Sequence, residues 1–146
     1  MIPVKKVDES DSSMILTGII VHGKQLGRTL GFPTANLQPD KPFEGTRGVY
    51  AGYFCVENGK RRPCMVNIGS HPTAPEGAPT IEAHLLDFSG DLYGCRAEIV
   101  LCFFLRPEQK FPSLEALKEQ LRRDREKTRA LLGTDSDLSI GHCKFP

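Results

Sequence analysis

The sequence predicts a mainly β protein, a small antiparallel barrel with one α-helix packed on it near the C-terminal end. Two observations predict this fold. Short apolar or alternating segments, separated by turns rich in glycine, proline and asparagine, run through most of the chain, and only 113–132 has helical spacing. Strands followed by a single helix do not form the alternating pattern of a parallel sheet, and a closed barrel leaves no exposed sheet edges.

The composition is that of one globular domain. The chain has 146 residues, of which 39% are hydrophobic and 25% charged, and its formal net charge is +1. No strong field therefore favours nucleic acid or a membrane surface, and no apolar run reaches the roughly 18 residues of a membrane-spanning helix. We expect a frayed segment over 1–13, which lacks the apolar centre of a secretory signal, a folded domain over 14–133 and a flexible tail over 134–146.

The cysteines do not form a zinc motif. Five are present, and no two have the C-x-x-C spacing. Most lie in apolar runs, where free cysteine packs like a small hydrophobic side chain. We therefore expect reduced thiols and a cytoplasmic protein.

Several segments have the composition of strands. Residues 48–56 and 63–68 flank Asn58-Gly59, which is a strong signal for a two-residue hairpin turn. The predicted strands are 14–22, 48–56, 63–68, 80–86 and 96–105.

The predicted helix has clear ends. Ser113 is a suitable N-cap, Glu115 places a carboxylate in the first turn, and Gly133 is suited to the C-terminal cap. One face is rich in leucine but is interrupted by Asp124 and Thr128, and we expect this face to pack on the barrel. The leucines are Leu114, Leu117, Leu121 and Leu131.

A glycine-rich segment follows the first strand. Gly23, Gly27 and Gly31 recur every four residues, with Lys24 and Arg28 beside two of them. Glycine lets backbone N–H groups approach an anion closely, so this segment could cradle nucleotide phosphates. Glycines also serve as bends in barrels, and the spacing alone does not decide between these roles. Neither a Walker phosphate loop nor a G-x-G-x-x-G motif is present.

The segment Pro33-Thr34-Ala35-Asn36 follows directly. The side-chain oxygens of Thr34 and Asn36 are hard ligands that suit Mg²⁺ bound to phosphate oxygens. Alternatively, the two side chains cap a turn.

A carboxylate lies on the strand predicted over 80–86. Ile81, Ala83 and Leu85 face one way, and Glu82 and His84 face the other. On most strands such a polar face is simply solvated. In the mouth of a barrel it would line a cavity, where Glu82 could accept a proton from an alcohol during phosphoryl transfer. His84 is then a hydrogen-bonded structural group.

Together these segments resemble the riboflavin kinase (flavokinase) family. The resemblance covers about residues 14–132, and the sequence of residues 85–94 is most similar to the kinase half of bacterial bifunctional FAD synthetases. The family resemblance implies a six-stranded antiparallel Greek-key barrel with a C-terminal helix. The motifs that carry it are GKQLGRTLGFPTANL (23–37), GVYAG (48–52), NIGSHPT (67–73), TIEAHLLDFSGDLYG (80–94) and LRPEQKFPSLEALKEQL (105–121).

The resemblance also implies the chemistry. ATP would phosphorylate the ribityl 5′-OH of riboflavin, giving FMN and ADP, with Mg²⁺ or another divalent cation as cofactor. Glu82 would be the base that accepts the hydroxyl proton, and Thr34 and Asn36 would ligate the metal.

Binding residues are implied in the same way. Arg106, Glu108 and Asp124 would lie near the flavin. The residues implied for the nucleotide are Gly23, Lys24, Leu26, Gly27, Arg28, Gly31, Pro33 and Thr34.

Two other functions stay open. The same barrel could be a catalytically silent module that binds flavin or nucleotide, although all the residues needed for turnover are present. An adenylyltransferase that makes FAD would use an H-x-G-H type motif, which this sequence lacks. The chain could still be the kinase part of a longer natural chain with an adenylyltransferase domain. We expect no nucleic-acid or membrane partner.

Overall fold

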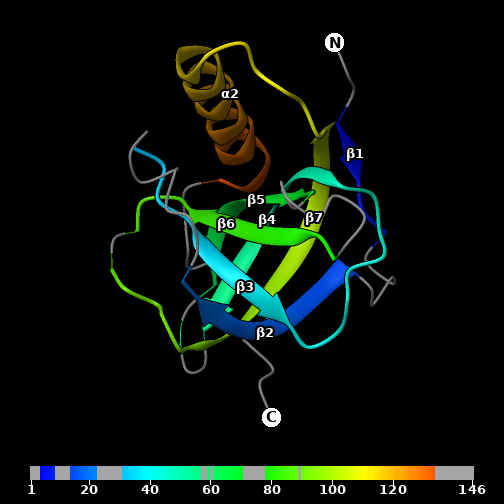
Figure 1. Cartoon of the computed structure of the whole chain (residues 1–146), viewed down its shortest axis with the longest axis vertical. Coiled ribbons are helices and arrows are strands. Elements are labelled where there is room, and N and C mark those ends of the chain that lie inside the picture. Colours follow the sequence, from blue (N-terminus) through cyan, green and yellow to red (C-terminus); the bar gives the residue numbers. More distant parts are fainter. Residues whose placement is uncertain are drawn as a thin grey trace.

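A computed structural model of the chain describes residues 4–8, 14–22, 31–56, 59, 61–70, 78–88 and 90–133. In this part of the chain, strands form a closed barrel and one helix lies against its outside (Figure 1). The elements are β1 (Lys5–Lys6), β2 (Ile15–Val21), β3 (Ala35–Pro39), β4 (Gly48–Val56), β5 (Arg62–Gly69), β6 (Thr80–Leu85), β7 (Arg96–Pro107) and α2 (Leu114–Leu132).

The sheet closes on itself. The strand order is β1-β7-β2-β3-β6-β5-β4, and a further pairing of β4 with β7 joins the two ends, so β2 to β7 form a six-stranded barrel. All the pairings are antiparallel. The predicted antiparallel barrel with a packed helix is therefore confirmed. Lys5 and Lys6 pair with β7.

The interior of the barrel is filled by the inward side chains of all six strands. Where β4 meets β7 the register shifts between Ala51 and Gly52. A Cβ atom on Gly52 would lie 2.0 Å from the carbonyl oxygen of Val100, so only glycine allows this close approach. The core includes Leu16, Ile20, Leu37, Phe54, Val66, Ile68, Ile81, Ala83, Ile99 and Leu101.

The caps of α2 are the predicted ones. The Ser113 hydroxyl accepts a hydrogen bond from the N–H of Ala116 at 3.1 Å, and the N–H of Gly133 donates to the carbonyl of Arg129 at 2.8 Å. Within the described residues, no helix combines the length and the apolar character needed to span a bilayer.

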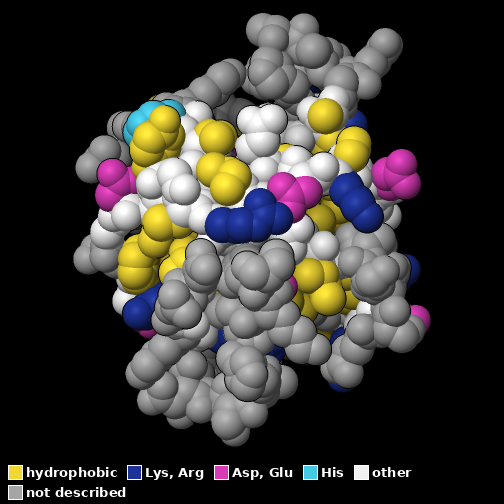
Figure 2. Space-filling view, turned by 90° about the horizontal axis from the view of Figure 1, so that it is seen from below, with side chains coloured by type: hydrophobic (Ala, Val, Ile, Leu, Met, Phe, Trp, Pro, Cys, Tyr) yellow, Lys and Arg dark blue, Asp and Glu magenta, His cyan; other side chains and the backbone are white. Residues whose placement is uncertain are grey.

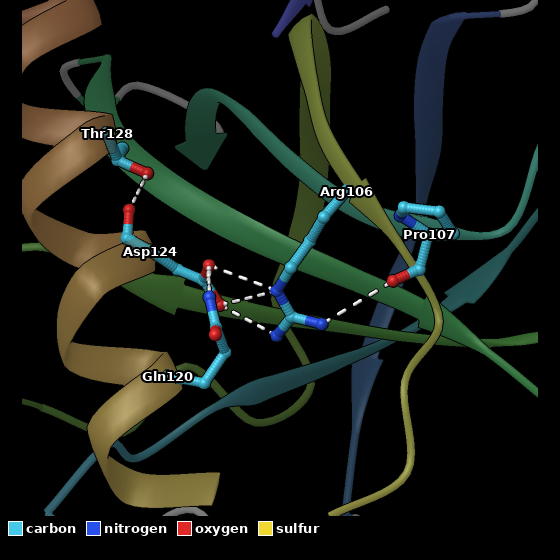
Figure 3. Close-up of polar contacts among 5 residues, drawn as sticks. All are labelled: Arg106, Pro107, Gln120, Asp124 and Thr128. Carbon is cyan, nitrogen blue, oxygen red and sulfur yellow. Dashed lines mark hydrogen bonds and ion pairs between the residues drawn. The ribbon is translucent and has the colours of Figure 1, made fainter. Parts of the chain in front are cut away.

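The predicted leucine face of α2 is wrong in part. Leu114 and Leu131 are 57% and 37% exposed, whereas the buried helix residues are Asp124, Thr128 and Leu132. Asp124 can be buried because Arg106 of β7 pairs with it (Figure 3). The polar residue that interrupts the leucine pattern therefore lies at the centre of the helix–barrel contact.

The strand pattern missed β3. This strand lies between β2 and β6, and Asn36 pairs with Val21 on one side and Glu82 on the other. Asn36 is therefore a strand residue, and the alternative that it caps a turn is wrong.

The described cysteines are mostly thiols. Cys64, Cys95 and Cys102 are free, and burial raises the pKa of the Cys64 thiol, which makes it a packing group rather than a nucleophile. Cys55 is disulfide-bonded, so the expectation of reduced cysteines is wrong at this position.

The outer surface mixes charges of both signs. On the face seen in Figure 2, dark blue and magenta side chains lie close together, with hydrophobic side chains scattered between them. Arg96 and Asp40 form an ion pair on the barrel surface, and Arg96, together with Thr17, lowers the pKa of the Asp40 carboxyl.

Candidate active site

Two cavities adjoin the start of β3. The first, of about 520 Å³, opens at the mouth of the barrel and is lined by Ile20 and Leu85 of the core and by Phe88, which follows β6. The second, of about 280 Å³, lies between the outer face of the sheet and α2. Thr34 is in the wall of both cavities, so the two meet at this residue.

Glu82 faces the second cavity rather than the barrel interior. Its neighbours Ile81 and Ala83 point into the core, and Glu82 and His84 point outward, under α2. The alternation of β6 was predicted correctly, but the expectation that its polar face lines the barrel mouth is wrong. The polar face is enclosed because a helix covers it.

Glu82 lies in a row of polar side chains that crosses three strands. Its directly paired residues are Asn36 of β3 and Asn67 of β5. Side chains directly opposite each other on adjacent strands have Cβ atoms roughly 4.5–5.5 Å apart. Asn36 lines the first cavity, whereas Glu82 and Asn67 line the second. The carboxylate is therefore held between two amides at the border of the two cavities.

Thr34 presents an unsatisfied oxygen at this border. Its Oγ1 atom is buried and has no hydrogen-bond partner among the described residues. A buried hydroxyl is unfavourable unless a partner satisfies it, so this atom is suited to a ligand. No group of three or more histidine, cysteine, aspartate or glutamate side chains that could hold a metal occurs in the described part. The side-chain oxygens of Thr34 and Asn36 are a donor set that suits Mg²⁺ bound to phosphates.

His84 holds the backbone next to Thr34. Its Nδ1 atom lies 2.8 Å from the carbonyl oxygen of Pro33, and because a carbonyl only accepts, Nδ1 must donate. Burial lowers the pKa of His84, and the hydrogen bond to Pro33 opposes this only in part. A neutral, hydrogen-bonded imidazole agrees with the structural role expected for it.

The second cavity has an ion pair beside it. Arg106 lines the cavity, and its Nε lies 3.1 Å from each carboxylate oxygen of Asp124 while its Nη2 lies 2.7 Å from one of them (Figure 3). Gln120 donates to the same carboxylate at 3.0 Å. Asp124 is 0% exposed and is not in the cavity wall, so it reaches the cavity only through Arg106.

Glu108 also lines the second cavity. Its carboxylate accepts hydrogen bonds from the backbone N–H of Ser70 and, at 3.2 Å, from the Ser70 hydroxyl. Arg47 donates to the same hydroxyl at 2.9 Å. Glu108 therefore ties the segment after β7 to the end of β5.

The first cavity has an aromatic wall. The rings of His22 and Tyr93 stack with centroids 3.7 Å apart and an angle of 13° between their planes. Tyr93 is among the most exposed large apolar side chains of the described part. A flat, exposed aromatic surface is suited to another planar ring.

Most of the glycine-rich segment lies outside the described residues. This applies to Gly23, Lys24, Leu26, Gly27 and Arg28. The chain is described again from Gly31, whose φ of +82° lies in the region that favours glycine, and Pro33 lines the first cavity.

Several lining residues were not predicted from the sequence. Asn67 could have been found from the strand register, because it pairs with Glu82. The apolar wall formed by Phe111, Leu117 and Leu121 depends on where α2 docks, which no local pattern shows.

Comparison with known proteins identifies the family. The family profile described as "Flavokinase: Riboflavin kinase" matches residues 11–132. This chain belongs to the flavokinase family. The flavokinase chain is 42% identical, over 118 residues, to the bifunctional riboflavin kinase/FMN adenylyltransferase of Escherichia coli (strain K12), an alignment that covers 81% of this chain and 38% of that protein. It is 40% identical over 111 residues to the RNA-binding riboflavin kinase RibR of Bacillus subtilis, covering 75% of this chain and 47% of that protein. The flavokinase chain thus spans less than half the length of these relatives.

Solved structures agree with the fold. The riboflavin kinase from Trypanosoma brucei superimposes with a TM-score of 0.58 at 30% identity, covering 81% of this flavokinase chain and 78% of that one. A Streptococcus pneumoniae chain described as a macrolide-efflux protein superimposes with a TM-score of 0.71 at 32% identity, covering 79% of this chain and 38% of that one.

Proposed function

We propose that this chain is a riboflavin kinase, which transfers the terminal phosphate of ATP to the ribityl 5′-OH of riboflavin and releases FMN and ADP. The observation that carries the proposal is the position of Glu82 at the border of two adjoining cavities. Phosphoryl transfer needs the γ-phosphate to meet the hydroxyl, with a proton acceptor beside that hydroxyl, and this border provides such a point. The family match over residues 11–132 supports the same reaction.

The first cavity receives the nucleotide in this proposal. The stacked rings of His22 and Tyr93 offer a surface for the adenine, and Gly31 and Pro33 lead from the glycine-rich segment to the cavity. The triphosphate then points toward Thr34, where the two cavities meet.

The second cavity receives the flavin. Its apolar walls, Phe111, Leu117 and Leu121, suit a planar ring system. Arg106 and Glu108 supply polar contacts at its edge. Asp124 contributes indirectly, because it is buried behind Arg106 and holds the guanidinium in place.

Thr34 and Asn36 would hold Mg²⁺. The unsatisfied Oγ1 of Thr34 and the side-chain oxygen of Asn36 supply two ligands, and phosphate and water oxygens would complete the coordination. When bound, the ion neutralises charge on the β- and γ-phosphates. Asn36→Ala should raise the Mg²⁺ concentration needed for half-maximal activity, and an unchanged metal titration would remove Asn36 from the ligand set.

Glu82 accepts the proton. The 5′-oxygen attacks the γ-phosphorus, the bond from that phosphorus to the β–γ bridging oxygen breaks, and the hydroxyl proton passes to the Glu82 carboxylate. A primary alcohol is a weak acid, so the proton moves late, and most of the acceleration comes from positioning and electrostatics. A general base typically contributes ~10²–10⁴-fold.

The direct test is conversion of riboflavin to FMN. The chain is incubated with riboflavin, ATP and Mg²⁺, and FMN and ADP are separated by chromatography. The proposal predicts equal amounts of the two products. A chain that binds riboflavin tightly but forms no FMN would instead be the silent binding module.

The proposal extends to the protein in which this domain would occur. Because the bifunctional relatives are named for a second activity and are longer, we propose that an adenylyltransferase domain accompanies this one in a longer natural chain, in the cytoplasm. The present chain should form FMN without forming FAD.

A further inference from the structure

Phe32 is held between the barrel and the helix. Its ring is only 4% exposed and lies 5.3 Å from the ring of His84 on β6, at an angle of 58°. On its other side, the guanidinium carbon of Arg125 on α2 lies 4.7 Å from the ring centroid, within the range of a cation–π contact.

The segment that begins at Phe32 touches both cavities. Phe32 lines the second cavity, Pro33 lines the first, and Thr34 lines both. His84 fixes the middle of this segment through its hydrogen bond to the Pro33 carbonyl. Phe32 and Thr34 are therefore parts of one short, anchored segment that joins the walls of the two cavities.

Arg125 belongs to the same side of α2 as the wall of the second cavity. Leu121 is one turn before it, and residues four apart are neighbours on a helix surface. The Nε atom of Arg125 is buried without a hydrogen-bond partner among the described residues. The ring of Phe32 is the packing contact that the structure shows for this guanidinium, which also lies close enough to Asp87 and His84 to act on them electrostatically.

We propose that Arg125 is a positioning residue that couples the two cavities through Phe32. This rests on the proposed function, in which flavin fills the cavity under α2 and nucleotide fills the barrel mouth. A flavin that packs on Leu117 and Leu121 fixes α2, and Arg125 then fixes Phe32 and the Thr34 that follows. Each ligand therefore increases the affinity of the other by the same factor.

The test measures that factor at equilibrium. Riboflavin fluorescence gives the Kd for riboflavin with and without saturating Mg²⁺ and a non-hydrolysable ATP analogue. We expect the nucleotide to tighten riboflavin binding by about fivefold or more in the parent chain. In Arg125→Gln the enhancement should fall below about twofold, while riboflavin binding alone changes little. Arg125→Lys should retain part of it, because an ammonium also interacts with the ring face.

A double-mutant cycle shows whether the coupling passes through the ring. Phe32→Leu should reduce the enhancement as Arg125→Gln does, and the double variant should lose no more than either single one. Additive losses would overturn the proposal.

Two controls come from the same helix. Arg123 is solvent-exposed, and Arg129, one turn after Arg125, forms an ion pair with Asp87. Arg123→Gln and Arg129→Gln should keep the parent's enhancement. The proposal is overturned if Arg125→Gln keeps it too, if Arg129→Gln loses it equally, or if the parent shows none. The proposed function fails differently, since a parent that couples the two ligands but makes no FMN would refute only the kinase assignment.

Discussion

The six residues of β6 alternate between two faces, and the two faces have different roles. On the inner face, Ile81, Ala83 and Leu85 pack in the barrel core. On the outer face, Glu82 and His84 line the cavity under α2. Because side chains alternate along a strand, one short segment both packs in the barrel core and presents the carboxylate that we propose as the proton acceptor. Substitution of Ile81, which lines neither cavity, should therefore change the free energy of unfolding, and substitution of Glu82 should change turnover.

The largest effect is expected at Glu82. Glu82→Gln keeps the size of the side chain but removes the proton acceptor, so kcat should fall by ~10²–10⁴-fold. Riboflavin Kd and Tm should stay close to those of the parent. Rates of FMN formation and fluorescence titrations measure these quantities, and parent-like turnover would show that another group takes the proton.

The inner face should show the opposite pattern. Ile81→Ala leaves a cavity in the core, and such substitutions typically lower the free energy of unfolding by about 2–5 kcal/mol. Urea unfolding measures this loss, and kcat per folded molecule should be unchanged. A large fall in kcat without a loss of stability would mean that the two faces are not separate.

A smaller effect is expected at the ion pair that holds α2 over the outer face of β6. Asp124→Asn leaves the Arg106 guanidinium without its counter-charge, which should destabilise the chain by about 1–3 kcal/mol and raise the KM for riboflavin. Asp87→Asn removes the more exposed pair with Arg129 and is the matched control, with an expected loss of at most about 1 kcal/mol. Equal losses in the two variants, measured by urea unfolding, would contradict the claim that the buried Arg106–Asp124 pair stabilises the chain more than the exposed pair.

The smallest effect concerns pH. Burial lowers the pKa of His84 below its usual value of 6.5, so the unfolded chain takes up this proton first as the pH falls. The contribution of the neutral imidazole to stability is complete above about pH 6.5 and is lost as the pH falls toward the folded-state pKa. His84→Gln should therefore flatten the pH dependence of the unfolding free energy below pH 6.5. Identical slopes in urea unfolding at pH 7.5, 6.0 and 5.0 would remove His84 as the cause.

Much of the fold could be predicted because it is local. The caps at Ser113 and Gly133 depend on neighbouring residues, and the alternation of β6 shows directly that Glu82 and Ile81 face opposite ways. The short strand β3 was missed because Ala35–Pro39 has few apolar residues and ends in proline, so its pairing with β2 and β6 defines it.

The enclosure of the site could not be predicted in the same way. Which face of β6 lines a cavity depends on where α2 docks, and that depends on the contact between Arg106 and Asp124, which are 18 residues apart. Without knowledge of Arg106, the sequence shows Asp124 only as an interruption of the leucine pattern.

In this proposal flavin and nucleotide occupy separate cavities that meet at Thr34, with Glu82 in the wall of the flavin cavity. A crystal structure with riboflavin, Mg²⁺ and a non-hydrolysable ATP analogue tests it most directly. The ribityl 5′-OH should lie about 2.6–3.2 Å from the Glu82 carboxylate, with the flavin ring against Leu121 and the triphosphate beside Thr34. A flavin bound in the mouth of the barrel, or a Glu82 carboxylate that contacts neither ligand, would contradict the account.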